Sequence, residues 1–194
     1  MTTSGKLPNT AHTDQRWRIH EIATDFRLED VWALPAHGGP EDFPKLVKLA
    51  APFDPERSIN PVVQALFAIR WKVGGWLGWD DEADGIDARV ATLRDRLPAD
   101  LRDGPAGPAF GATPFTPLYL TDTEWAAEIA NKTMHGILHL GWVPDGDGYR
   151  GQMAVLVKRN GVFGAAYMAA IMPFRHLLVY PAMLREIGRR WQQA

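Results

Sequence analysis

The C-terminal segment, residues 161–191, constrains the fold of this chain more than any other part of its sequence. Apolar side chains such as Phe163 and Leu184 recur there every three or four residues, which is the period of an amphipathic helix. Pro173 and Pro181 each remove a backbone donor, so the pattern predicts a kinked helix or two abutting helices. Because the segment follows a predicted β-hairpin, we expect antiparallel strands packed against a final helix.

The rest of the chain carries short strand signals and short helix signals. The predicted strands are residues 16–23, 118–120, 124–130, 134–143 and 149–159, and the predicted helices are residues 41–51, 61–73 and 87–97. Residues 30–34 are predicted to be a short strand or an extended entry to the next element. A loop rich in Gly and Pro, residues 103–117, precedes the later strands. Thr121 and Glu124 could instead form a capping box that opens a helix over residues 124–130. The order of elements favours an α+β fold with an antiparallel sheet.

Length and charge limit the number of domains and the kinds of partner. With 194 residues the chain fits one domain, which we place at residues 16–194 behind a disordered N-terminal arm, residues 1–15. The net charge of -2 gives no bulk attraction to nucleic acid or to an anionic membrane, so we expect no nucleic-acid partner. The longest apolar run, residues 161–174, is too short to span a bilayer, and we expect no integral membrane association.

Residues that the chain lacks exclude or disfavour several kinds of site. It has no cysteine, which excludes disulfides, thiolate metal sites and a cysteine nucleophile. Ser4 and Ser58 are its only serines, which argues against a serine hydrolase. The glycine cluster at residues 74–78 is not G-x-G-x-x-G and follows a predicted helix, so we expect no nucleotide cofactor and assign no other cofactor. The polar N-terminus lacks the apolar core of a signal peptide, and we expect a cytoplasmic protein.

Glu124, Glu128, His135 and His139 are the sharpest candidates for catalytic chemistry. On a helix, two histidines four residues apart could bind one metal ion. On a strand they share a face but lie roughly 13 Å apart, which is too far for one ion. The glycines at positions 136 and 141 disfavour a helix, so we expect no metal site here.

A β-hairpin would instead bring the same residues together in pairs. If residues 131–132 form a two-residue loop, Glu128 lies opposite His135 and Glu124 lies opposite His139, with Cβ atoms about 5 Å apart. A glutamate beside a histidine raises the pKa of the imidazole and orients the ring, which suits general acid–base catalysis. The alternative is two polar pairs on a solvated face of the sheet, and a loop longer by one residue would remove both contacts.

The sequence resembles a bacterial family of unknown function called DUF2867. The likeness is carried by EWAAEIANKTMHGILHLGWV at residues 124–143, GYRGQMAVLVKRNG at residues 148–161 and YMAAIMPFRHLLVYPAMLREIGRRW at residues 167–191. That family is grouped with the START-like (SRPBCC) helix-grip superfamily. The resemblance implies a strand at residues 124–130 and a curved antiparallel sheet wrapped around a long C-terminal helix. It also implies a cavity between them for an apolar molecule, because superfamily members bind lipids, sterols and polyketides.

We therefore expect the chain to bind a small hydrophobic or amphipathic molecule between the sheet and its last helix. The candidate lining residues share an apolar or aromatic side chain in segments expected to face that cavity, except for an arginine that could bind a carboxylate. They are Trp71, Trp142, Met153, Tyr167, Ile171, Phe174 and Arg70. Arg175 and His176, which interrupt the last helix, could also fix a carboxylate of the ligand. Alternatively, the Arg175 guanidinium could extend to the surface or pair with a carboxylate of the chain itself.

Two other functions fit the same sequence. The cavity could be the active site of a cyclase or hydrolase that uses a Glu–His pair, which requires these pairs to face the cavity. The chain could also be a dimeric interaction module that partners a reductase, because some relatives resemble tails behind a dehydrogenase-like domain. That function requires an exposed apolar interface.

Overall fold

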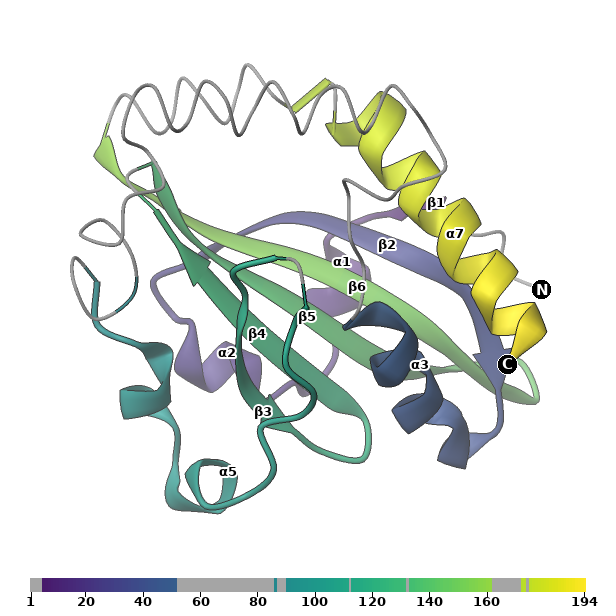
Figure 1. Cartoon of the computed structure of the whole chain (residues 1–194), viewed down its shortest axis with the longest axis horizontal. Coiled ribbons are helices and arrows are strands. Elements are labelled where there is room, and N and C mark those ends of the chain that lie inside the picture. Colours follow the sequence, from purple (N-terminus) through teal and green to yellow (C-terminus); the bar gives the residue numbers. More distant parts are fainter. Residues whose placement is uncertain are drawn as a thin grey trace.

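The computed structural model describes residues 5–51, 86, 90–111, 113–131, 133–161, 172–173 and 175–194 (Figure 1). Its strands are β1 (Gly5–Leu7), β2 (Arg27–Gly38), β3 (Thr116–Leu120), β4 (Glu124–Ala130), β5 (Met134–Asp145) and β6 (Gly148–Arg159). Its α-helices are α1 (Thr10–Thr13), α2 (Ile19–Ile22), α3 (Phe43–Ala50), α5 (Ala99–Arg102) and α7 (Tyr180–Gln193). Shorter turns are the 3₁₀ turns η1 (Pro40–Asp42) and η4 (Leu93–Arg96) and the π-helical turn η5 (Arg175–Val179).

The described strands form one six-stranded sheet in which all neighbours run antiparallel. Their order is β1-β2-β6-β5-β4-β3, so the consecutive strands from β3 to β6 lie side by side and β2 adds to the far edge of β6. The molecule is therefore a mixed helix and sheet structure with an open antiparallel sheet and a C-terminal helix. The sequence-based prediction is confirmed at this level.

The β5–β6 hairpin forms the centre of the sheet. Its pairing runs from Met134 opposite Arg159 to Asp145 opposite Gly148. The turn contains Gly146 at φ 62°, a left-handed conformation that glycine adopts without steric cost. The predicted strands at residues 134–143 and 149–159 are confirmed. Residues 124–130 are strand β4 and not a helix.

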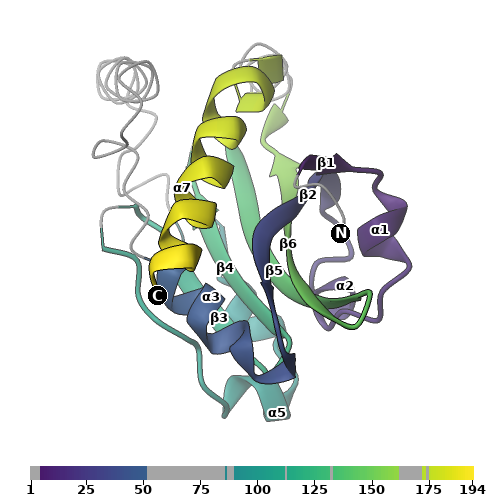
Figure 2. The same cartoon turned by 90° about the vertical axis from the view of Figure 1, so that its right-hand side faces the viewer.

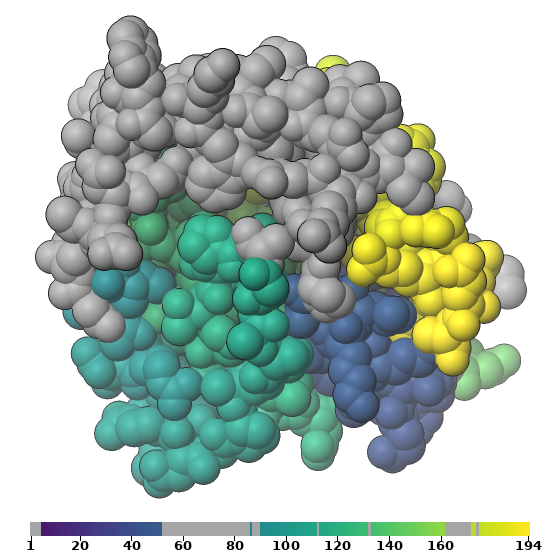
Figure 3. Space-filling model, in the orientation of Figure 1, coloured from purple at the N-terminus to yellow at the C-terminus, as the bar shows by residue number. Residues whose placement is uncertain are grey.

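Helices cover both faces of the sheet (Figure 2). α3 and α7 pack on one face, which we call the α7 face, and α1 and α2 with η4 and α5 cover the other, which we call the α2 face. Alternate residues of β5 supply apolar side chains to both faces of the sheet. Leu140 and Trp142 enter the apolar cluster of the α7 face, while Ile137 and Val143 enter that of the α2 face. Figure 3 shows α3 and α7 next to each other on the molecular surface.

Residues 5–22 pack onto the sheet, which corrects two predictions. From Gly5 onward the chain is not a disordered arm, because β1 pairs with β2 and α1 buries His12 completely. Ile19–Ile22 is helix α2, whereas a strand was predicted over residues 16–23. The buried side chains Ile19 and Ile22 are three residues apart, which fits a helical turn and not the alternation of a strand.

β2 is longer than the strand predicted at residues 30–34 and is irregular. Its register against β6 shifts between Leu28 and Asp30 and again between Ala33 and His37. Such bulges bend the strand that carries them. Pro35, which cannot donate to a sheet, lies inside the second irregularity.

The remaining helix predictions have mixed outcomes. The helix predicted at residues 41–51 is present as η1 and α3, whereas only the short turn η4 forms in the described part of residues 87–97. The chain ends in α7, which begins beside Pro181 after the turn η5. The helix predicted at residues 61–73, and residues 162–171 of the C-terminal segment, lie outside the described residues. Within the described part of the chain, no helix has both the length and the apolar character needed to cross a membrane.

Candidate functional site

The β4–β5 hairpin brings the predicted glutamates and histidines together with a different register. Glu128 lies opposite Ile137 and Glu124 lies opposite Gly141, so each histidine is a diagonal neighbour of its glutamate and not the residue directly across. The tight turn comes one residue later than predicted, because Asn131 N–H donates to the carbonyl of Met134. A shift of this size changes the pairing by two positions and keeps all four side chains on the same face.

An asparagine explains where the turn falls. The Asn131 side-chain oxygen accepts hydrogen bonds from the backbone N–H groups of Thr133 and Met134 at 2.9 and 3.1 Å and from the Thr133 hydroxyl at 2.7 Å. This is the local side chain to backbone pattern by which asparagine holds turns. The sequence contains this signal, and it favours Asn131 as the first residue of the turn.

Both Glu–His pairs form, and both are buried. His135 Nε2 lies 2.7 Å from Glu128 Oε2, and His139 Nε2 lies 3.2 Å from Glu124 Oε2. None of the four residues is more than 4% exposed. The alternative of polar pairs on a solvated face is therefore wrong, because α1, α2 and η4 cover them.

Glu128 anchors the turn η4. Its carboxylate accepts hydrogen bonds from the Thr92 hydroxyl at 2.5 Å and from the Leu93 N–H at 3.1 and 3.2 Å. Thr92 in turn caps η4, because its hydroxyl accepts from the Arg94 N–H. These contacts use both carboxylate oxygens, so the Glu128–His135 pair fixes a neighbouring element to the sheet.

Glu124 holds the start of α2 in a similar way. Its two oxygens accept from the Arg18 N–H at 3.0 and 2.9 Å, and the Tyr119 hydroxyl donates to it at 2.9 Å. Burial alone would raise the pKa of Glu124, but hydrogen bonds from His139, Arg18 and Tyr119 hold that pKa below its ordinary value. Burial and the adjacent Glu124 charge raise the pKa of Tyr119, so its hydroxyl stays a donor.

Two further histidines extend the Glu124–His139 pair toward the surface. His139 Nδ1 lies 3.1 Å from His12 Nε2, and His12 Nδ1 lies 3.1 Å from His20 Nε2. We call the series His20–His12–His139–Glu124 the histidine chain. His12 is fully buried at its middle, and His20 at its outer end is partly exposed. Burial, with His139 and His20 adding smaller effects, lowers the pKa of His12 to about 2.

No pattern in the sequence selects His12 and His20. They are eight residues apart on separate one-turn helices, and His12 falls in the predicted arm. Only the docking of α1 and α2 onto the sheet brings them to His139.

The histidine chain is not arranged to bind a metal ion. The two nitrogens of His12 point to different rings, so the three imidazoles cannot direct their lone pairs at one point. Among the described residues, no group of three or more histidine, aspartate or glutamate side chains could hold a metal ion. The histidine chain can exchange protons, because each ring can donate with one nitrogen and accept with the other.

The Glu–His pairs lie on the α2 face, away from α7. Ala126 lies between the two glutamates on the same face of β4, and Ile137 lies between the two histidines on the same face of β5. Both belong to the apolar cluster beneath α1 and α2. The pairs therefore do not face the space between the sheet and α7, which the cyclase or hydrolase alternative required.

Trp142 and Met153, two predicted lining residues, lie on the α7 face. Both are buried in the apolar cluster under α3 and α7. Trp142 Nε1 donates to the Gly39 carbonyl at 2.9 Å, and its ring stacks with Tyr149 and lies 5.9 Å from the ring of Trp191. The other predicted lining residues lie outside the described residues, namely Arg70, Trp71, Tyr167, Ile171 and Phe174.

A cluster of charged and polar side chains lies where α7 begins, and we call it the Asp30 cluster. The Asp30 carboxylate is fully buried on β2 and lies 2.5 Å from His176 Nε2 and 3.2 Å from the Tyr180 hydroxyl. Lys6 Nζ lies 3.3 Å and an Arg175 nitrogen 3.6 Å from its oxygens. Arg175 also donates to the Tyr180 hydroxyl. Arg175 thus pairs with a carboxylate of the chain, which was one of the sequence-based alternatives.

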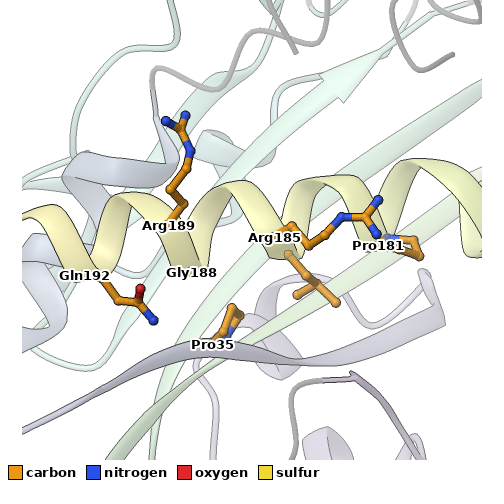
Figure 4. A pocket seen from close by; sticks show the side chains of 7 residues that line it. Pro35, Pro181, Arg185, Gly188, Arg189 and Gln192 are labelled. Carbon is orange, nitrogen blue, oxygen red and sulfur yellow. The ribbon is translucent and has the colours of Figure 1, made fainter. Parts of the chain in front are cut away.

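An open groove of about 540 Å³ lies between α7 and β2 (Figure 4). Pro35 of β2 forms one wall, and Pro181, Arg185, Gly188 and Gln192 of α7 form the other. Arg189 also lines the groove, and its side chain extends away from Pro35. The helix comes close to β2 here, because a Cβ atom added at Gly188 would lie 3.1 Å from Pro35 Cγ.

Comparison with known proteins places the chain in a family. No curated protein and no solved structure matches the sequence. One family does match, described as a protein of unknown function (DUF2867), and the match covers residues 22–182, which is most of the chain. The chain therefore belongs to the DUF2867 family.

Proposed function

We propose that the chain is a helix-grip protein that binds a small amphipathic molecule between its sheet and its C-terminal helix. The observation that carries the proposal is that the apolar layer beneath α7 adjoins the buried Asp30 cluster. Trp32 is part of that apolar layer, and its ring lies 4.7 Å from Tyr180 and 5.9 Å from His176. A molecule with an apolar body and a polar end would match both surfaces.

The charges of the Asp30 cluster favour an anionic end. Lys6 and Arg175 bring two positive charges to the single negative charge of Asp30, and His176 adds a third when it is protonated. The Arg175 side chain is 17% exposed, so it is not fully enclosed by the cluster. Arginine binds carboxylate and phosphate groups through parallel hydrogen bonds.

Two features of the fold support a ligand at this position. The sheet is antiparallel throughout, and α7 crosses one face of it, which is the arrangement that a helix-grip fold needs. The helix enters through a π-helical turn that carries both Arg175 and His176, and π-helical turns are frequent at functional sites.

Native mass spectrometry and calorimetry would test the proposal. We expect the purified protein to carry a small apolar molecule that is released on unfolding. The stripped protein should bind decanoate more tightly than decanol, because only decanoate has an anionic end. Loss of the Arg175 contact in Arg175→Gln should weaken decanoate binding about 10- to 100-fold and leave decanol binding unchanged.

Arg189→Gln is the matched control. Arg189 also lies on α7, but it pairs with Glu186 and is 49% exposed. It should bind both probes like the wild type. Equal binding of decanoate and decanol, unaffected by Arg175→Gln, would refute the anionic end. Protein that is consistently empty and binds neither probe would refute ligand binding itself.

The structure offers less support for the two alternatives. The enzyme alternative needs a Glu–His pair beside the α7 face, and both pairs lie on the α2 face. The dimeric module needs an exposed apolar patch, and Leu177 is the one exposed large apolar side chain among the described residues. A single side chain of this kind is ordinary for a protein surface.

A further inference from the structure

The segment that carries α1 and α2, residues 10–22, is attached to the sheet by apolar packing and by hydrogen bonds, most of which involve an ionisable side chain. Trp17, Ile19 and Ile22 pack into the apolar cluster of the α2 face. The polar attachments are the histidine chain, the Arg18 N–H to Glu124, and the Gln152 amide to the Ala11 carbonyl at 3.1 Å. We call residues 10–22 the latch segment.

The closed latch needs an uncharged His12. This ring is fully buried, and each of its nitrogens already bonds to another imidazole. Glu124, the carboxylate of the histidine chain, bonds to His139 and not to His12. An imidazolium at His12 would therefore lack direct carboxylate contact while losing its hydration.

The charged groups around the histidine chain do not offset this cost. Tyr119 from β3 donates to Glu124 and stays protonated. The Arg18 guanidinium turns outward to Asp100 of α5, 2.7 Å away, and to Glu21 of α2, 3.6 Å away. His20 and His139, the two groups that touch His12, carry no negative charge that could stabilise a positive charge on it.

We propose that residues 10–22 are an acid-released latch, which stays on the sheet while His12 and His20 are neutral and detaches when they take up protons. Release would uncover the apolar side chains of the α2 face, including Val31, Ile137 and Leu156. The device lies on the face opposite α7, so it stands independently of the proposed ligand site.

The direction and size of the effect follow from the proton balance. The pKa of His12 falls from 6.5 to about 2 when the latch is closed, so the open state binds more protons at any pH between these values. Stability of the closed latch is complete above pH 6.5 and is lost as the pH falls below it. From pH 7 to pH 5, His12 alone increases the open fraction about 25-fold. His20, whose pKa is also lowered by burial, acts in the same direction.

Hydrogen exchange of the full chain tests the latch. Protection factors, corrected for intrinsic rates at each pH, would be measured by mass spectrometry at pH 7 and pH 5. We expect protection of residues 10–22 to fall at least 25-fold, while protection of β5 changes much less. Equal loss in both places would mean general unfolding and would refute a latch.

Glutamine variants separate proton uptake from packing. His12→Gln keeps a donor and an acceptor but cannot titrate, so the fall in protection between pH 7 and pH 5 should be at least tenfold smaller. His20→Gln changes a partly exposed position and should also reduce the fall, which keeps the test decisive if His12→Gln does not fold. His37→Gln, at a 45% exposed site on β2, should behave as wild type. The proposal would be overturned if protection did not fall in the wild type. It would also be overturned if the fall were undiminished in His12→Gln, or in His20→Gln where His12→Gln does not fold.

Discussion

A neutral imidazole is the one side chain ring that donates from one nitrogen and accepts at the other, and the α2 face uses this property in series. Glu124 is a carboxylate and accepts only, so His139 must donate to it from Nε2. With His139 neutral, its Nδ1 is an acceptor, which requires His12 to donate from Nε2. His12 Nδ1 is in turn an acceptor, which requires His20 to donate to it from Nε2. One carboxylate thereby sets the tautomer of three rings.

Nitrogen-15 NMR of histidine side chains at pH 7.5 checks this order of donors and acceptors. We expect His12, His20 and His139 each to carry its proton on Nε2, with Nδ1 unprotonated. His135 serves as an internal reference, because its Nε2 also faces a carboxylate, 2.7 Å away. A proton on Nδ1 of His12 or His139 would contradict the order of donors and acceptors.

At the scale of elements, the latch segment docks where β5 offers no side chain. The Trp17 ring lies directly over Gly141, and a Cβ atom added there would lie 2.7 Å from two ring carbons of Trp17. Trp17 also packs edge-on against His139 at 5.2 Å. Position 141 must therefore be a glycine, because the Trp17 ring lies too close to leave room for a side chain. This contact fixes the position of Trp17 and, with it, the start of α2.

Gly141→Ala should therefore displace Trp17 and weaken the docking of α2. Overpacking of this kind costs roughly 1–3 kcal/mol, which urea denaturation would measure. The comparison variant is Gly111→Ala, because a Cβ atom at Gly111 would meet nothing within 4 Å. We expect its stability to stay within about 0.5 kcal/mol of wild type. An equal loss in both variants would mean that contact with Trp17 is not the cause.

Element length decided what could be predicted from the sequence. β5 and β6 are each 12 residues long and are joined by a glycine turn, so alternation and turn chemistry identify them. α1 and α2 are four residues each, too short for a helical period to appear. The Glu–His partners were predicted correctly because a shift of two positions in the register keeps each side chain on the same face. Their burial depends on α1 and α2, so it could not be predicted from the sequence of the hairpin alone.

At the scale of the whole molecule, the sheet separates two apolar clusters. Ile19 and Trp17 belong to the cluster on the α2 face, and Leu184 and Ile187 belong to the cluster on the α7 face. The two clusters share strands but not side chain partners, because alternate residues of each strand point to opposite faces. The ligand proposed on the α7 face and the latch proposed on the α2 face would then act with little mutual influence.

Double-mutant cycles measured by urea denaturation test that separation. Ile19→Val and Leu184→Ala change opposite faces, and their effects on the free energy of unfolding should add within about 0.5 kcal/mol. Ile187→Val and Leu184→Ala change one cluster on the same helix, and residues in contact show interaction energies of roughly 0.5–3 kcal/mol. An interaction energy above about 1 kcal/mol between the faces would show that packing on one side is transmitted through the sheet. Release of the latch would then alter the α7 face, and the ligand site and the latch would have to be treated as coupled.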